Sequence, residues 1–299
     1  MLWNKLGNIF DSSKHNEIIS HASNPVAIKL KDNIYRIFFS TRNQERKSSV
    51  AFIDIDIISL EVVGTLSKIV FKYGANESFY SHGVSIGNCY TQADKNFILF
   101  MGWQLRENEH WKGEIGRLEL LNKKDLILTP SSAFMKLDKE DPISLSYPYV
   151  VNHNNIYKMW YGSTLDWTSE NDEMIHVINY ATSTDGENWN KHGIAIPYEI
   201  GVAQAFSKPS VIIDENGYHM WYSYRSGDGT KYRIGYSFSN DGINWERKHD
   251  EVGIDVSELG WDSEMICYPF IFYHNGETYM LYNGNDYGKT GFGLAILEK

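Results

Sequence analysis

Cysteine and positive charge are both scarce in this chain of 299 residues. Its two cysteines, Cys89 and Cys267, cannot form a disulfide framework, and we expect two buried thiols in a reducing compartment. Lys and Arg number 28 against 38 Asp and Glu, and no run of Lys or Arg exceeds two residues. Because a formal charge of −10 would repel a phosphate backbone, we expect no nucleic-acid partner.

Long apolar runs and proline are scarce as well. No stretch approaches the roughly 18 uninterrupted apolar residues of a membrane span, and the first residues lack the apolar core of a signal peptide. We therefore expect a soluble protein, cytoplasmic if the native chain starts here. Only 7 Pro accompany 24 Gly, while aromatic residues make up 14% of the chain. This balance predicts short strands joined by tight turns.

An aromatic strand pattern recurs five times along the chain. The five segments are Tyr35–Ser40, Phe97–Gly102, Tyr157–Gly162, Tyr218–Ser223 and Tyr279–Gly284, with starts 62, 60, 61 and 61 residues apart. Each follows a short run that opens at Pro25, Gly83, Pro148, Pro209 or Pro269. A third strand comes next, then Ser-x-Asp-Gly-x-x-Trp turns at Ser183–Trp189 and Ser239–Trp245. Four antiparallel strands at this period form one propeller blade, so the sequence predicts an all-β, five-bladed β-propeller.

The predicted ring also needs closure, because an unpaired last blade would expose a sheet edge. The fifth repeat stops at Lys299 after its third strand, and Trp3–Ile9 matches Trp189–Ala195, the outer-strand segment of blade 3. We expect residues 1–12 to form the outer strand of blade 5. The single predicted domain then divides into blades at 13–75, 76–138, 139–199, 200–258 and 259–299.

We expect the functional site at the central funnel, because the loops that lead into the innermost strands line its mouth. The position two before each Pro or Gly is small in every blade, which indicates crowding: Ser23, Ser81, Ser146, Ser207 and Cys267. The position one before it is polar or amphipathic and varies, which indicates a binding surface: Asn24, His82, Tyr147, Lys208 and Tyr268.

These features resemble the five-bladed glycosidase propellers. The resemblance rests on the opening Asn24–Val26, the aromatic strands and the Ser-x-Asp-Gly-x-x-Trp turns. The group includes glycoside hydrolase families 43, 32, 62, 68 and 130. Two further segments, Trp261–Met265 and Tyr282–Gly291, look most like hydrolase-like propellers encoded with bacterial surface polysaccharide genes. The resemblance implies a carbohydrate-active enzyme with a triad of carboxylates.

That triad is missing from its expected places. The three positions hold Asn24, Tyr147 and Ser207–Lys208. Because glycoside hydrolysis usually needs two carboxyl groups, other acids of the funnel loops would have to take the roles. We predict Glu264 as the first catalytic acid, with Asp262 or Asp141 as its partner. The alternative for each is a solvated loop acid or a turn cap.

Other side chains of the same loops are predicted to bind substrate. These residues are Asn24, Arg42, His82, Trp103, Asp166, Trp167, Lys208, Arg225, Asn285 and Asp286, with Trp111 as a further aromatic candidate. Indole faces suit a pyranose ring, and the three cations suit a carboxylate, phosphate or sulfate on the ligand. Blade packing and surface salt bridges are the alternatives. We predict no metal site and no cofactor.

Three functions fit this sequence. The leading hypothesis is a glycoside hydrolase that acts on a bacterial glycan, charged or neutral. The rival is a non-catalytic glycan-binding propeller in polysaccharide assembly, which the missing triad favours. The third is a phosphorylase or glycosyltransferase on the same scaffold, with the cations holding phosphate. An oligosaccharide or polysaccharide is the expected partner, while the sugar, the linkage and the oligomeric state stay open.

Overall fold

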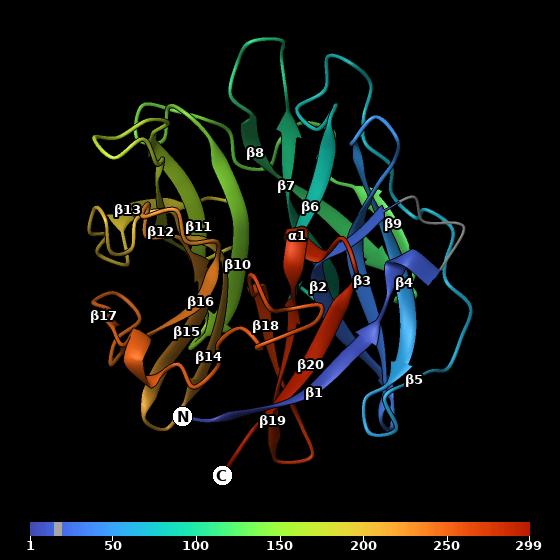
Figure 1. Cartoon of the computed structure of the whole chain (residues 1–299). Helices are drawn as coiled ribbons and strands as arrows, with labels where there is room; N and C mark the ends of the chain where they lie inside the picture. Colours follow the sequence, from blue (N-terminus) through green and yellow to red (C-terminus); the bar gives the residue numbers. More distant parts are fainter. Residues whose placement is uncertain (15–19) are drawn as a thin grey trace.

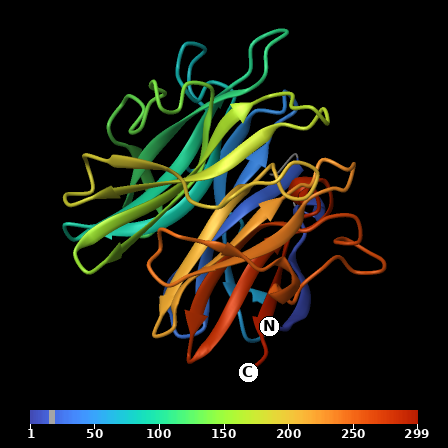
Figure 2. The ribbon, with the colours of Figure 1, turned by 90° about the vertical axis from the view of Figure 1, so that its left-hand side faces the viewer.

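The computed structural model describes residues 1–14 and 20–299, which form five antiparallel sheets of four strands each. Figures 1 and 2 show the sheets arranged as blades around a common axis. Helical segments are short: η1 (Ser12–Lys14), η2 (His249–Glu251) and the turn labelled α1 (Asn285–Gly288). The predicted all-β, five-bladed β-propeller is confirmed.

Each blade uses consecutive strands in sheet order, apart from the closing strand of blade 5. Blade 1 holds β2 (Ser20–Lys31), β3 (Ile34–Arg42), β4 (Ser48–Asp56) and β5 (Glu61–Val62); blade 2 holds β6 (Gly83–Gln92), β7 (Lys95–Gln104), β8 (Lys112–Leu121) and β9 (Asp125–Leu128); blade 3 holds β10 (Leu145–His153), β11 (Ile156–Asp166), β12 (Ile175–Ser183) and β13 (Asn190–Ile194); blade 4 holds β14 (Ser207–Asp214), β15 (Gly217–Tyr224), β16 (Arg233–Ser239) and β17 (Glu246–Arg247); blade 5 holds β18 (Cys267–His274), β19 (Glu277–Asn283), β20 (Phe292–Leu297) and β1 (Trp3–Phe10). The first strands of neighbouring blades contact one another, so they are the inner strands of the ring.

The aromatic second strands supply the layers between blades. Trp160 and Trp221 are almost fully buried. Trp160 of blade 3 meets Trp245 of blade 4 edge-on, with ring centroids 5.9 Å apart. Burying an aromatic side chain of this size contributes roughly 2–3 kcal/mol, so side-chain packing between the sheets holds neighbouring blades together.

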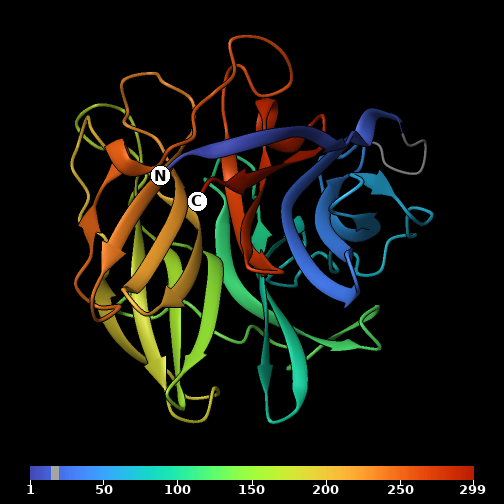
Figure 3. The same ribbon diagram turned by 90° about the horizontal axis from the view of Figure 1, so that it is seen from below.

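The ring closes through the N-terminal strand, as the sequence predicts. β1 pairs with β20 as the fourth strand of blade 5, with Trp3 opposite Leu297 and Phe10 opposite Phe292. Figure 3 shows the two chain ends lying close together on this face. Trp3 also meets Trp221 of blade 4 edge-on at 5.9 Å, so the closing strand binds both its own sheet and the next blade.

A buried ion pair fixes this closing strand to its blade. Lys5 Nζ donates to Asp262 Oδ2 at 2.8 Å, and Tyr282 OH donates to the same oxygen at 3.1 Å. Asp262 is only 2% exposed. Because this carboxylate is buried, its charge depends on Lys5 for compensation.

Blade 3 has a matching ion pair between its own outer strand and a buried aspartate. We call each of these two lysine–aspartate pairs a latch. Lys191 Nζ lies 2.6 Å from Asp141 Oδ2, and Tyr161 OH donates to that oxygen at 2.9 Å. Asp141 is 1% exposed. The match between the outer-strand sequences of blades 3 and 5 therefore has a physical meaning, since the lysine of each segment reaches a buried aspartate.

We predict that Lys5→Met lowers the free energy of unfolding by about 3–5 kcal/mol, because it leaves Asp262 buried without its cation. The double variant Lys5→Met/Asp262→Asn should recover most of that loss. Urea denaturation measures both values. Lys95→Met serves as the control, because Lys95 is 59% exposed and pairs with Glu119 at the surface. A Lys5→Met protein as stable as this control would contradict the latch.

The inner strands bulge at the position one before each Pro, where the sequence predicts a binding surface. Asn24, Tyr147, Lys208 and Tyr268 have φ values of 56°, 38°, 53° and 56°, a left-handed conformation that is unfavourable for side chains other than glycine. The strand register shifts around each of them. Strain repeated at one place in four blades points to the centre of the ring as the functional region.

Blade 2 departs from this column. Its bulge lies at Gly87–Asn88 rather than next to His82. Gly87 also keeps the repeat better than Gly83, because it lies 62 residues after the first proline of the series and 61 before the next. His82 therefore lies outside the set of bulged residues.

Candidate functional site

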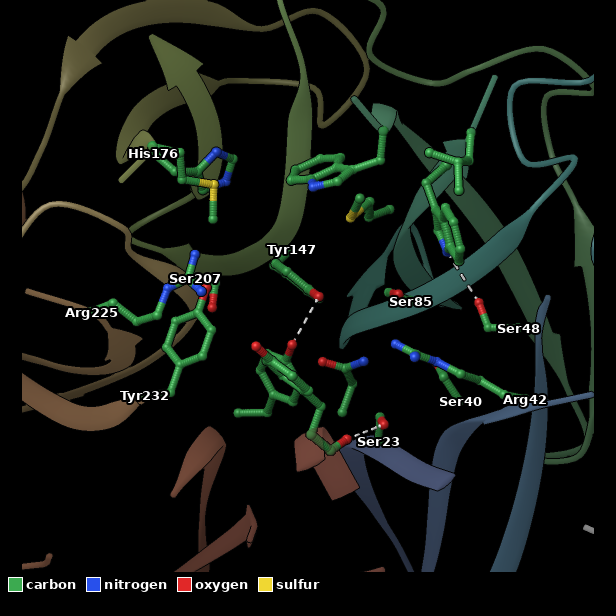
Figure 4. Close-up of a pocket in the computed structure, with 18 residues that line it drawn as sticks. Ser23, Ser40, Arg42, Ser48, Ser85, Tyr147, His176, Ser207, Arg225 and Tyr232 are labelled. Carbon is green, nitrogen blue, oxygen red and sulfur yellow. Dashed lines mark hydrogen bonds between the residues drawn. The ribbon is translucent and has the colours of Figure 1, made fainter. Parts of the chain in front are cut away.

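A cavity of about 310 Å³ opens at the centre of the ring, and all five blades contribute to its wall. Its volume is in the range of small-ligand pockets. Figure 4 shows the labelled side chains around it, with Tyr147 in the middle and Arg42 and Arg225 on opposite sides. The cavity therefore lies where the bulged inner strands meet.

Four tyrosines give this cavity hydroxyl groups: Tyr147, Tyr232, Tyr268 and Tyr287. Tyr147 OH donates to Tyr268 OH at 3.4 Å. Burial raises the pKa of Tyr147, Tyr232 and Tyr268 above the ordinary value. These phenols stay protonated at neutral pH, so they act as hydrogen-bond donors and acceptors and not as anionic nucleophiles.

Two polar atoms of the wall are buried without a protein partner, Asn24 Oδ1 and Arg225 Nε, while the hydroxyl of Ser207 interacts with the phenol of Tyr232. An unpaired buried polar atom costs about 1–3 kcal/mol. A ligand with hydroxyl groups suits both atoms, because a hydroxyl donates to an amide oxygen and accepts from a guanidinium N–H. The wall is thus incomplete without a polar ligand.

The two arginines of the cavity differ in their pairing. Arg225 Nη2 donates to Glu173 Oε1 at 2.7 Å, and its guanidinium lies over the ring of Tyr232, 5.0 Å from the centroid. Arg42, the last residue of β3, forms no salt bridge and no side-chain hydrogen bond within residues 1–14 and 20–299. One cation of the cavity is therefore compensated and the other is not.

Blades 2 and 3 give the cavity an apolar wall. Its members are Met101, Trp103, Leu105, Trp111 and Met174. Trp103 Nε1 donates to Ser48 Oγ at 3.1 Å, which fixes the indole. Trp111 meets Trp167 edge-on with centroids 4.8 Å apart. Fixed indoles beside hydroxyl groups suit a ring with one apolar and one polar face.

His176 lines the same cavity, but at neutral pH it lacks the acidic proton of an imidazolium. Its Nε2 lies 2.6 Å from Ser146 Oγ and its Nδ1 lies 2.8 Å from Thr164 Oγ1. Burial, helped by the nearby Arg225 cation, lowers the pKa of His176 to about 3. The ring is therefore neutral, held by two hydroxyls, and acts as part of the wall.

Four of the predicted binding residues line the cavity: Asn24, Arg42, Trp103 and Arg225. Two others lie behind the wall. The ring of His82 is 5.9 Å from that of Trp103, and Trp167 supports Trp111. The structure thus brings together the amide, cationic and aromatic candidates from blades 1, 2 and 4.

Glu264, the first predicted catalytic acid, lies outside the cavity wall. Its side chain is 57% exposed and pairs with Lys231 at the surface. Its backbone N–H donates to Asn285 Oδ1 at 2.8 Å, so Asn285 holds this loop in place instead of lining the cavity. The placement supports the alternative of a solvated loop acid.

The other predicted acids do not line the cavity either. Asp141 and Asp262 are the buried carboxylates of the two latches. Asp166 is exposed and accepts a backbone N–H two residues further on, and Asp286 lies 3.9 Å from Lys289 at the surface. Within residues 1–14 and 20–299, no carboxylate lines the cavity. The predicted catalytic pair is therefore not assembled there.

Lys208 is fully buried and does not belong to the cavity wall. Its Nζ donates to the carbonyl oxygen of Gly87 at 2.6 Å and lies 5.6 Å from the ring centroid of Phe270. Burial lowers the pKa of Lys208 to about 7. Instead of binding ligand, this lysine joins the inner strands of blades 2, 4 and 5.

We predict that Lys208→Met raises the free energy of unfolding more at pH 7 than at pH 9.5. The folded pKa is about 7 and the unfolded value is about 10.4, so the unfolded chain binds more protons between those values. The penalty for burying the charge is therefore complete below pH 7 and fades toward pH 10. Urea denaturation of both chains at the two pH values measures it. An equal difference at both would contradict this account.

Several wall residues have no signal in the repeat. Tyr232, Tyr287, His176 and the serines Ser40, Ser48 and Ser85 belong to neither sequence column. Tyr287 follows Asp286 in a turn where both have positive φ, 58° and 53°. Such a turn next to Gly288 is the only local sign that this segment carries a side chain toward the centre.

The described part of the chain holds neither a cluster of metal-ligating side chains nor a long apolar helix. Residues 1–14 and 20–299 contain no group of three His, Cys, Asp or Glu side chains that could surround a metal ion. Within the same residues, no helix is long and apolar enough to cross a membrane.

The comparisons with known proteins give a family of relatives. No model of a known protein family matches the chain. The chain is 39% identical over 303 residues to "Uncharacterized protein Rv1502" of Mycobacterium tuberculosis (strain ATCC 25618 / H37Rv), with 100% of both chains covered. It belongs to the same family as that protein.

Solved structures share its fold at low sequence identity. A structure named "Glycoside hydrolase" has a TM-score of 0.80 at 13% identity, covering 99% of this chain and 92% of the other. A GH130 structure, from a family of "mannoside phosphorylases" that contains "glycoside hydrolases that target beta-1,2 mannosidic linkages in Candida mannan", has a TM-score of 0.66 at 14% identity, covering 94% and 85%. The resemblance to the glycosidase propellers is confirmed as a likeness of fold.

Proposed function

We propose that this protein is a carbohydrate-active protein that binds one sugar unit of a glycan in the central cavity, without hydrolysis by a pair of carboxylates. The main support for this proposal is the set of groups in the cavity wall. The wall presents one buried polar atom without a partner, Asn24 Oδ1, together with the hydroxyl of Ser207 and protonated phenols. It also presents fixed indoles, and no carboxylate among the residues that the structure describes.

A sugar ring matches this wall in both of its parts. Its hydroxyl groups donate and accept, which suits the amide of Asn24, the hydroxyl of Ser207 and the tyrosines. Its C–H face suits Trp103 and Trp111. The likeness of fold to glycoside hydrolases and phosphorylases supports carbohydrate as the ligand class.

Among the residues that the structure describes, no carboxyl group lines the cavity, so hydrolysis by two carboxylates lacks its catalytic groups there. That reaction needs one acid to protonate the leaving oxygen and a second carboxylate about 5 Å or roughly 6.5–9.5 Å away. The wall offers protonated phenols and the neutral His176 in their place. These groups hold a sugar by hydrogen bonds, and none of them is an acid or base suited to neutral pH.

Bond cleavage is the second candidate function, and one contact favours it. Glu173 pairs with Arg225, and it is the only carboxylate of residues 1–14 and 20–299 that pairs with a side chain of the wall. If the protein cleaves or transfers a glycosidic bond, Glu173 is the acid closest to the bound sugar. Glu264 would then be dispensable.

Calorimetric titration with a panel of oligosaccharides, followed by product analysis, tests the proposal. We expect one ligand per chain and no released sugar. Ser207→Ala should raise the dissociation constant about five- to tenfold, because one hydrogen bond is lost. Thr91→Ala is the control, since Thr91 is exposed at the far end of β6.

Two results would contradict the proposal. The first is that no member of the panel binds, or that Ser207→Ala and Thr91→Ala bind alike. The second is a released sugar, with turnover that falls at least about a hundredfold in Glu173→Gln. That second result would establish the enzyme in place of the binding protein.

A further inference from the structure

Arg42 is the charged group of the cavity that lacks compensation. It lies at the end of β3, in the wall of the cavity. Figure 4 shows its guanidinium pointing inward from the side opposite Arg225. Among residues 1–14 and 20–299, Arg42 has no carboxylate partner, whereas Arg225 is paired with Glu173 at 2.7 Å.

The charge of Arg42 acts on two neighbouring groups of the inner strands. Burial, Arg42 and Lys289 together lower the pKa of His21 to about 4, against the opposing charge of Asp286. Arg42 also acts on the Tyr147 phenol in the middle of the cavity, where it opposes the rise in pKa that burial causes. The charge of Arg42 is therefore felt both at His21 and at the phenol of Tyr147.

The unpaired guanidinium of Arg42 is half-buried in the cavity wall, where no side chain of the described residues replaces the water that it has lost. A surface carboxylate could have paired with it, as Glu173 pairs with Arg225. The planar fork of N–H donors matches a carboxylate, sulfate or phosphate through two parallel hydrogen bonds. The phenol of Tyr147 supplies a further donor in the same cavity.

We infer that Arg42 determines the specificity of the cavity and selects a glycan whose bound sugar unit carries an oxyanion, a carboxylate, sulfate or phosphate. This inference rests on the proposed function and narrows its ligand class to acidic sugars. Arg225 is then a positioning residue, because its charge is already compensated by Glu173 and its Nε remains for a sugar oxygen.

Titration with matched ligands tests the inference. The ligands are a galacturonic acid trisaccharide, the neutral galactose trisaccharide of the same linkage, and the 6-sulfated and 6-phosphorylated forms of the neutral chain. We expect at least one acidic form to bind ten- to a hundredfold tighter than the neutral chain. Arg42→Gln should remove that advantage, so that it weakens binding of the acidic chain at least about threefold more than binding of the neutral chain. Arg42→Lys should restore part of it, because the charge returns without the fork.

Arg106→Gln is the control for general charge, because Arg106 is exposed in the loop after β7. It should change every affinity less than about twofold, and thermal melting checks that each variant is folded. Equal binding of acidic and neutral chains by the wild type would overturn the inference while the proposed function stands. The inference would also be overturned, with the proposed function still standing, if Arg42→Gln weakened binding of acidic and neutral glycans equally. Promotion of neutral-chain binding by inorganic phosphate would have the same meaning. Absence of binding to every glycan would overturn both.

Discussion

The pairing of β1 with β20 is the contact on which the rest of this structure depends. It turns five sheets into a closed ring, and closure brings blade 5 against blade 1. Only in that arrangement do Asn24 of β2 and Tyr268 of β18 meet at one cavity. Backbone Asn24 N also donates to Asn283 Oδ1 of blade 5 at 2.9 Å, so the site and the closure share a blade boundary. The Lys5–Asp262 ion pair holds the strand that makes this geometry possible.

The cavity combines the fold of glycoside hydrolases with a different set of functional groups. Within the residues that the structure describes, the acids that the sequence predicts for the site lie in latches, in a turn cap or at the surface, and Glu173 pairs with Arg225 of the wall. Hydroxyls, an amide, indoles and two guanidinium groups line the centre in their place. Such a wall favours recognition of a sugar over protonation of a glycosidic oxygen. Three residues with a left-handed backbone, Asn24, Tyr147 and Tyr268, give their side chains to this wall from the inner strands.

The sequence predicts the fold well because buried aromatic residues and turn residues recur in every repeat. Both are local signals that can be recognised without the structure. The sequence also names Asn24, Arg42, Trp103 and Arg225, which the structure places in the cavity wall. Asn24 precedes the proline of an inner strand, and the other three lie at or next to the ends of second strands. The sequence does not show that Asp141 and Asp262 lie in ion pairs outside the cavity wall, because position in a loop does not reveal that a lysine of the outer strand neutralises the acid. Nor does it show that the side chain of Lys208 donates to a backbone carbonyl of blade 2. Those outcomes depend on contacts between distant segments.

An experimental structure with an acidic oligosaccharide bound tests the central claim most directly. The account predicts one intact sugar unit in the central cavity, with hydroxyl groups on Asn24 Oδ1 and Ser207 Oγ and its oxyanion on Arg42. A ligand bound outside this cavity would contradict it, for example one held by Glu264 and Lys231 at the rim. A cleaved ligand with Glu173 against the broken bond would also contradict it.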